Sequence, residues 1–111
     1  MPVIQKFVDD LAAGGVLENA LAGSAFEFAP RNQVISIGVV SNILGGFVTI
    51  QVGSSIVLEE SPAVVKTTFP VIPDEMYYQD IAAQGDRIVV RLRNSAVGVM
   101  DFRIIVQTTN L

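Results

Sequence analysis

The chain has 111 residues, of which 50% are hydrophobic and 16% are charged, and its formal net charge is −4. This length predicts one domain that buries roughly two-thirds of its unfolded surface. The absence of cysteine and histidine excludes disulfides, thiolate chemistry and histidine-based catalysis or metal binding. The acidic balance provides no overall positive field for nucleic acid or an anionic membrane.

The apolar content is high for a small chain, with a mean hydropathy of +0.52. Small proteins have little interior, so part of this apolar surface is expected to lie against neighbouring subunits. Burial in a lipid surface is the competing explanation. We favour assembly of several copies over contact with a membrane.

Residues 1–23 are predicted to form an amphipathic helical arm. Apolar side chains recur at helical spacing within residues 3–12, and Gly14-Gly15 ends the segment. The predicted stripe consists of Val3, Ile4, Phe7, Val8 and Leu11. Residues 16–22 are compatible with a further short helical turn. Such an arm would lie across its own sheet, dock on a neighbouring subunit or rest on a membrane. The segment has a single cation, Lys6, among several acids, so docking on protein is favoured.

Residues 24–111 change to short apolar strands separated by turn clusters, which predicts an antiparallel β-sandwich of seven or eight strands. The expected strands are 25–29, 33–41, 46–52, 56–60, 64–69, 75–82 and two arms within 86–107. No sustained helical period occurs after residue 23, and the segment 75–82 is ambiguous between a strand and one helical turn. The expected fold is therefore all-β and jelly-roll-like, preceded by the helical arm.

Residues 32–58 contain no charged residue, and an uncharged stretch of this length must be considered as a transmembrane helix. Glycines and turn signals interrupt it, and its β-branched residues alternate along the chain. These features favour strands over a membrane helix. Strands of this composition are expected to be buried on both faces or to meet another subunit with one face.

Residues 86–107 have the clearest strand pattern in the sequence. Apolar side chains alternate with polar ones in two arms joined at Asn94-Ser95, which predicts an antiparallel hairpin. The expected inner residues are Ile88, Val90, Leu92, Met100, Phe102, Ile104 and Val106. Pairing Leu92 with Met100 would place Arg91 opposite Asp101 on the outer face.

No pattern in the sequence matches a catalytic or metal site. Glu59-Glu60 and Asp74-Glu75 are adjacent along extended chain, so the carboxylates of each pair point to opposite faces. Asp74, Glu75, Asp80 and Asp86 flank one loop region, and a structural calcium site there is an open alternative, although their spacing matches no known calcium loop. The glycines match no phosphate-binding motif. We expect no enzyme activity, no cofactor and no catalytic residues.

Two groups of side chains are candidates for binding. Arg87, Arg91, Arg93 and Arg103 would share the outer face of the predicted hairpin, where they form a candidate contact surface or a phosphate-binding surface. A solvated face, or arginines paired with acids, is the preferred interpretation because the chain is acidic and has few aromatic residues. Tyr77 and Tyr78 are a candidate ligand patch, although adjacent residues of a strand point to opposite faces.

Taken together, the N-terminal segment, the short strands and the closing phrase GDRIVVRLRNSAVGVMDFRIIVQ (85–107) resemble small viral virion proteins of the capsid type with a jelly-roll fold. The resemblance covers most of the chain as a pattern. It implies a non-enzymatic structural protein that self-assembles, with copies of itself and other virion proteins as partners. It also implies location in the virion after synthesis in the host cytoplasm.

A ligand-binding β-sandwich module is the alternative, in which Tyr77, Tyr78 and the acidic loop would bind a glycan or a receptor, with calcium as a possible aid. Fold alone does not choose between the two functions. Nucleic acid and a lipid membrane remain partners that the sequence permits but does not favour.

Overall fold

The computed structural model describes residues 3–24, 26–69 and 78–110, and these residues form strands, turns and loops without a helix. The described residues contain nine strands: β1 (Val3–Leu11), β2 (Val16–Leu17), β3 (Gln33–Ser41), β4 (Gly46–Val52), β5 (Ser55–Pro62), β6 (Val64–Val65), β7 (Tyr78–Ala82), β8 (Ile88–Asn94) and β9 (Met100–Asn110). The all-β character predicted for residues 24–111 is confirmed over their described part, and the segment predicted as a helical arm is β-structured as well.

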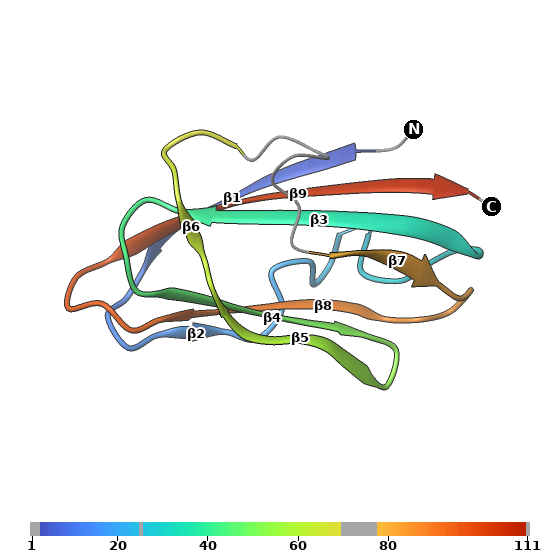
Figure 1. The fold of residues 1–111 in the computed structure, drawn as a ribbon, viewed down its shortest axis with the longest axis horizontal. Helices are drawn as coiled ribbons and strands as arrows, with labels where there is room; N and C mark the ends of the chain where they lie inside the picture. The colour runs from blue at the N-terminus through green and yellow to red at the C-terminus, as the bar shows by residue number, and fades with distance from the viewer. Residues whose placement is uncertain (1–2, 25, 70–77, 111) are drawn as a thin grey trace.

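The strands form two sheets that pack face to face as a β-sandwich (Figure 1). The first sheet has the order β1-β9-β3, and β7 and β6 pair with different parts of β3. The second sheet has the order β2-β8-β4-β5. Every pairing is antiparallel except the short one between β3 and β6.

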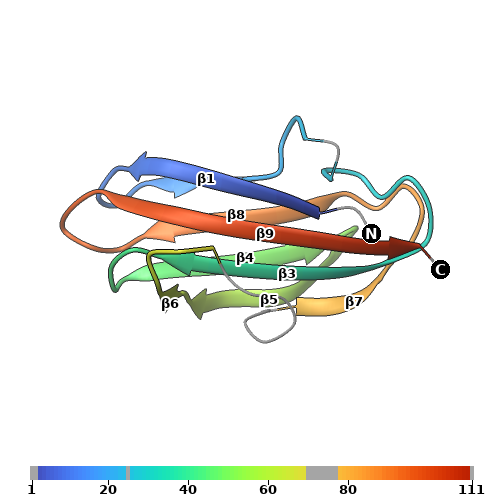
Figure 2. The same cartoon turned by 90° about the horizontal axis from the view of Figure 1, so that it is seen from above.

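The strand pairs are nested around the connection between β4 and β5. These two strands pair with each other, β3 pairs with β7, β2 pairs with β8, and β1 pairs with β9. The first and last strands are therefore neighbours, and the chain crosses repeatedly between the two sheets (Figure 1). Seen from above, β1 lies along one side of the molecule and β7 along the other (Figure 2).

The core lies between the sheets and consists of the apolar residues that alternate inward along the long strands. From the first sheet come Ile35, Ile37, Val39, Phe102, Ile104 and Val106, and from the second come Val48, Ile50, Val52, Ile88, Val90 and Leu92, all buried. Side chains at every second position of a strand point to one face. The inner face predicted for residues 86–107 is therefore confirmed.

The predicted hairpin between the two arms of residues 86–107 is wrong. β8 pairs with β4 and β2 in the second sheet, whereas β9 pairs with β1 and β3 in the first. Residues 95–99 cross between the sheets, so the two apolar faces pack against each other instead of lying side by side. Arg91 is consequently opposite Thr49 of β4, not opposite Asp101.

The predicted N-terminal helix is also wrong, because residues 3–11 form β1, which pairs with β9 from Val3↔Gln107 to Leu11↔Met100. Ile4 and Val8 pack against the core, while Val3 and Phe7 remain exposed. The segment contains β-branched residues, which suit a strand, and as a strand it satisfies the backbone groups along the edge of β9. Tertiary pairing thus overrides the helical spacing.

The remaining local predictions met mixed outcomes. Strands occur as expected over 33–41 and 46–52, which replaces the alternative of a membrane helix, and β5 covers the segment predicted at 56–60. Residues 26–29 are turn and loop with one isolated bridge, Phe28↔Arg87, so the strand predicted there is wrong over the described part. The strand predicted at 64–69 is limited to β6. Of the ambiguous segment, Tyr78–Ala82 is a strand.

β3 is enclosed on both faces along nearly its whole length. Ser36 and Val40 point away from the core between the sheets, yet they are only 5% and 1% exposed. The hydroxyl of Ser36 accepts a hydrogen bond from the amide Nε2 of Gln79 on β7 at 3.1 Å. Of the two alternatives expected for the uncharged strands, burial on both faces is therefore observed for β3, whereas Phe47, Thr49 and Gln51 on the outer face of β4 are partly exposed.

Candidate functional site

The four predicted arginines do not share one face. Arg91 and Arg93 lie on β8 and Arg87 immediately precedes it, all in the second sheet. Their side chains lie on its outer face because Ile88, Val90 and Leu92 point into the core. Arg103 lies on β9 in the first sheet, where its guanidinium stacks on the Phe7 ring at 4.7 Å. The outer face of the second sheet therefore carries three of the arginines.

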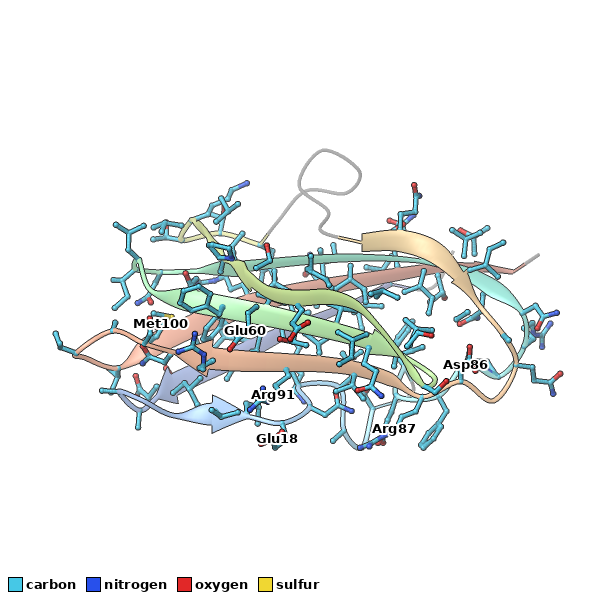
Figure 3. All side chains as sticks on the ribbon, turned by 60° about the horizontal axis from the view of Figure 1, so that its bottom comes forward. Glu18, Glu60, Asp86, Arg87, Arg91 and Met100 are labelled. Atoms are coloured by element: carbon cyan, nitrogen blue, oxygen red, sulfur yellow. The ribbon has the colours of Figure 1, made fainter. Side chains whose placement is uncertain are left out.

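Each of those three arginines forms an ion pair with a glutamate from a different segment. Arg87 Nε lies 3.0 Å from Glu27 of the loop before β3, and Arg91 Nε lies 3.1 Å from Glu18 after β2. Arg93 Nε lies 2.9 Å from Glu60 of β5. Figure 3 shows Arg91 close to Glu18, with Glu60 on β5 and Arg87 near the turn that holds Asp86.

Arg93 reaches Glu60 by crossing the strand between them. Its guanidinium stacks on the ring of Phe47 of β4 at 4.5 Å, and the two residues are register partners. A guanidinium on an aromatic face gains a cation–π interaction beside its ion pair. The ion pair of Arg93 with Glu60 therefore joins β8, β4 and β5 on the outer face. The three ion pairs together balance three positive charges with three negative ones.

Glu27 is the most strongly held of the three carboxylates. The pKa of Glu27 lies below its ordinary value, first because the Gly23 backbone N–H donates to it at 2.9 Å and then because of Arg87. Both interactions favour the ionised carboxylate. The pair between Arg87 and Glu27 is thus already formed by the chain itself, and this reduces the capacity of the face to bind phosphate.

An open depression of about 410 Å³ lies on this face between the arginines and the loop after β2. It is lined by Glu18, Asn19, Gln51, Gly53, Arg87, Val89 and Arg91. Asn19 holds one wall in place, because its side chain donates to the Ile88 carbonyl oxygen and accepts from the Val90 N–H. Sequence reasoning missed Asn19, since an asparagine in a short loop gives no sign that it bonds to a strand distant in the sequence.

A cluster of three carboxylates lies where β1 meets β9. Asp9 and Asp10 form a bulge opposite Asp101, Asp10 has a positive φ of 53°, and its N–H donates to Asp101 Oδ1 at 2.9 Å. Oxygens of the three side chains lie within 4.8 Å of one another. Desolvation, followed by the charge of Asp10, raises the pKa of Asp9. The cluster offers hard oxygen ligands, but fewer than the six to eight that Ca²⁺ takes.

One end of the sandwich presents exposed apolar side chains on loops without charge. Ile43 and Leu44 lie between β3 and β4, and Val97 and Val99 lie between β8 and β9, with 38%, 80%, 103% and 57% exposure. We call these four residues the apolar end. The two loops touch, because the N–H and hydroxyl of Ser95 both donate to the Gly45 carbonyl oxygen.

Asn94 fixes the loop between β8 and β9 from inside and ties it to the end of β1. The two Nδ2 protons of its fully buried side chain serve three acceptors, the carbonyl oxygens of Leu11, Ala12 and Gly98, so that one proton is shared. Its Oδ1 accepts from the Ala96 N–H. A buried asparagine with all these partners holds the surrounding backbone in one arrangement. The exposed Val97 and Val99 therefore lie on a loop whose backbone is fixed by hydrogen bonds, and the exposed Leu44 lies on the adjoining loop, which Ser95 contacts.

The predicted N-terminal contact residues divide between the two faces of β1. Ile4, Val8 and Leu11 pack against the core, whereas Val3 and Phe7 are 48% and 44% exposed. Alternation along a strand separates them, in contrast to the single stripe that a helix would have formed.

Part of the predicted ligand patch lies outside the described residues. Tyr77, Asp74 and Glu75 belong to the segment 70–77, and only the backbone of Tyr78 and Asp80 is described, within β7. Asp86 stabilises the turn that contains it, because its Oδ2 accepts a hydrogen bond from the Ala83 N–H at 3.0 Å.

Comparison of the chain with protein-family models, curated proteins and solved structures gives no significant match. Among the described residues, no helix is long and apolar enough to cross a membrane.

Proposed function

We propose that this chain is a non-enzymatic structural protein that self-assembles, as a viral capsid protein or another component of a virion. The apolar end is the observation that carries the proposal. Large apolar side chains on uncharged loops are costly to leave in water, and contiguous apolar patches mark interaction surfaces. Asn94 holds the loop of Val97 and Val99 in place, and Ser95 joins it to the loop of Ile43 and Leu44, before any partner binds. Loops that are already ordered lower the entropic cost of association.

The strand order supports a jelly-roll assignment within the β-sandwich. If the two-residue β6 is left out, the strand order is β1-β9-β3-β7 in the first sheet and β2-β8-β4-β5 in the second. A chain folded back on itself and then rolled into two sheets has this order, and capsid and lectin domains are among the proteins that use such a fold. The proposed location is therefore the virion, with copies of this chain and other virion proteins as partners.

The charge arrangement supports protein partners over nucleic acid. Arg87, Arg91 and Arg93 are each paired with a glutamate, so binding a phosphate backbone there would require three ion pairs to break. The rim near the apolar end carries Asp9, Asp10 and Asp101, which disfavours an anionic membrane.

Sedimentation velocity and native mass spectrometry over a wide range of concentration test self-assembly, and electron microscopy tests for regular particles. We expect the wild-type protein to associate, and the pair L44E and V97E to lower its mass because both side chains are exposed. Ile56→Glu on β5 is the control for placing a glutamate at an exposed apolar position, since Ile56 is 57% exposed and lies outside the apolar end. A wild-type monomer at every concentration would refute the proposal.

A second candidate function is binding of a small polar ligand such as a glycan, favoured by the depression beside Arg91. Its polar lining and the fixed wall at Asn19 suit hydrogen bonding to hydroxyl groups. A panel of glycans should then raise the melting temperature of the wild-type protein, and Gln51→Ala should remove that rise. No shift with any glycan would exclude this candidate.

A further inference from the structure

We infer that β1 is the strand through which two copies of this chain join, by antiparallel pairing of β1 with β1 of the second copy across a two-fold axis. This inference rests on the proposed self-assembly and names one of its contacts. The first sheets of the two copies would then form a single continuous sheet, in which each β1 lies between its own β9 and the β1 of the other copy.

Among the described residues, residues 3–8 of β1 are the longest stretch of edge strand with a regular register. β1 pairs with β9 and with no other strand there, and residues 3–8 follow β9 without a register shift. β2 and β6 have two residues each and β7 has five, while β5 is interrupted by two register shifts. Short and bulged edges resist pairing with another chain, whereas a long regular edge offers a row of backbone donors and acceptors.

Symmetry and charge together favour one register for self-pairing of residues 3–7. A two-fold axis perpendicular to the sheet keeps the outer faces of both copies on the same side of the joined sheet. Directly opposed residues of the two β1 strands must then have their side chains on the same face. The axis therefore passes through a residue position and not midway between two residues. An axis at Lys6 would place two ammonium groups opposite each other, which is unfavourable. An axis at Gln5 pairs residues 3–7 of both copies and stops before the bulge at Asp9 and Asp10. The inferred contact is therefore centred on Gln5.

This register also covers exposed apolar side chains. Val3 and Phe7 both lie on the outer face and are 48% and 44% exposed. With the axis at Gln5, Val3 of one copy lies opposite Phe7 of the other, and the same pair forms again on the far side of the axis. Aromatic and β-branched side chains directly opposite each other stabilise a pair of strands. The Phe7 ring already carries Arg103 on one side, so the contact extends an existing stack.

Single cysteines test the register directly, because the chain has none of its own. Directly opposed residues have Cα atoms about 4.5–5.5 Å apart, within the range of a disulfide. Gln5→Cys should therefore form a disulfide-linked dimer when the protein is treated with diamide. Val3→Cys is the matched control on the same strand, because the two copies of residue 3 would lie about 13 Å apart.

The pairing of Val3 with Phe7 gives a second measurement. Val3→Cys and Phe7→Cys should each stay unlinked alone but form a mixed disulfide dimer when the two variants are combined before oxidation. Circular dichroism and thermal melting confirm that each variant folds. The double variant L44E and V97E in the Gln5→Cys background should still link, since the apolar end takes no part in this contact.

The outcomes separate this inference from the proposed function. If the wild-type protein assembles but Gln5→Cys and the mixed pair stay unlinked, the β1 contact is refuted and self-assembly stands. If the wild-type protein is monomeric at every concentration, the proposed self-assembly and the β1 contact are both refuted. Linkage of Gln5→Cys and of the mixture, with Val3→Cys alone unlinked, supports the inferred register.

Discussion

Asn94 at the end of β8 donates a hydrogen bond through Nδ2 to the carbonyl oxygen of Leu11 at the end of β1, over 2.9 Å. The two residues belong to different sheets, so this bond fastens one layer of the sandwich to the other at the apolar end. Three further bonds of the same side chain reach Ala12, Ala96 and Gly98. One buried amide therefore joins the end of β1 to the loop between β8 and β9.

Asn94→Ala is expected to destabilise the protein by about 1–3 kcal/mol, because it removes a fully buried side chain that bonds to the Leu11 and Gly98 carbonyl oxygens and to the Ala96 N–H. Urea denaturation followed by circular dichroism measures the loss. Ser95→Ala is the control, since the Ser95 side chain is exposed and donates a single bond to Gly45. A loss for Asn94→Ala no larger than that of the control would contradict the role assigned to Asn94.

Gly46→Ala is expected to cost about 1–3 kcal/mol, since an added methyl group in a packed core forces its neighbours to move. A Cβ at Gly46 would lie 3.0 Å from Met100 Sδ and 3.0 Å from the ring of Phe102. Gly98→Ala serves as the control, because a Cβ there meets nothing within 4 Å. Equal melting temperatures for the two variants would show that the core near Met100 is loosely packed.

Asp9→Asn is expected to stabilise the protein at neutral pH. The pKa of Asp9 is raised in the folded state above its ordinary value of 3.8, so the ionised side chain weakens the fold at pH 7. The native state regains that stability as the pH falls through the raised pKa toward the ordinary value. The variant should lack this gain, which urea midpoints at several pH values measure. Glu59→Gln, with the same change in charge on β5, is the control, and a similar stabilisation there would point to net charge as the cause.

Glu27→Gln is expected to destabilise the protein at neutral pH, with the opposite dependence on pH. The pKa of Glu27 is lowered below its ordinary value of 4.5, so its stabilisation is fully present above 4.5 and is lost as the pH falls through the folded-state pKa. Acid titrations of stability should show a smaller loss for the variant than for the wild type. Glu18→Gln, the partner of exposed Arg91, is the comparison, and its effect should be smaller because its carboxylate is 79% exposed.

Much of the fold follows from local patterns in the chain. The alternation of Ile88, Val90 and Leu92 with arginines predicts which side chains enter the core, and the structure buries all three. The strands at 33–41 and 46–52 were also predictable from β-branched alternation and flanking turns. The three ion pairs were not, because each joins an arginine to a glutamate from a segment distant in the sequence.

The N-terminal segment shows where local patterns fail. Val3, Ile4, Phe7, Val8 and Leu11 fit a helical spacing in the sequence. In the structure the bulge at Asp9 and Asp10 shifts the strand alternation by one position, so that Leu11 points inward like Ile4 and Val8. A strand with a bulge can therefore have the apolar spacing of a helix. The segment forms a strand and not a helix because its backbone can pair with the edge of β9, which the local sequence does not reveal.

By itself the sequence determined the β character of the chain after its N-terminal segment, the inward and outward faces of β3, β4, β8 and β9, and the absence of cysteine and histidine chemistry. These properties depend on residue type and on the period of two along a strand, which are local. Only the tertiary structure decided that β8 and β9 lie in different sheets and that Arg103 is separated from the other arginines. The physical reason is that backbone hydrogen bonds are chemically alike in every strand pair, so the alternation of side chains specifies a face but not the neighbouring strand.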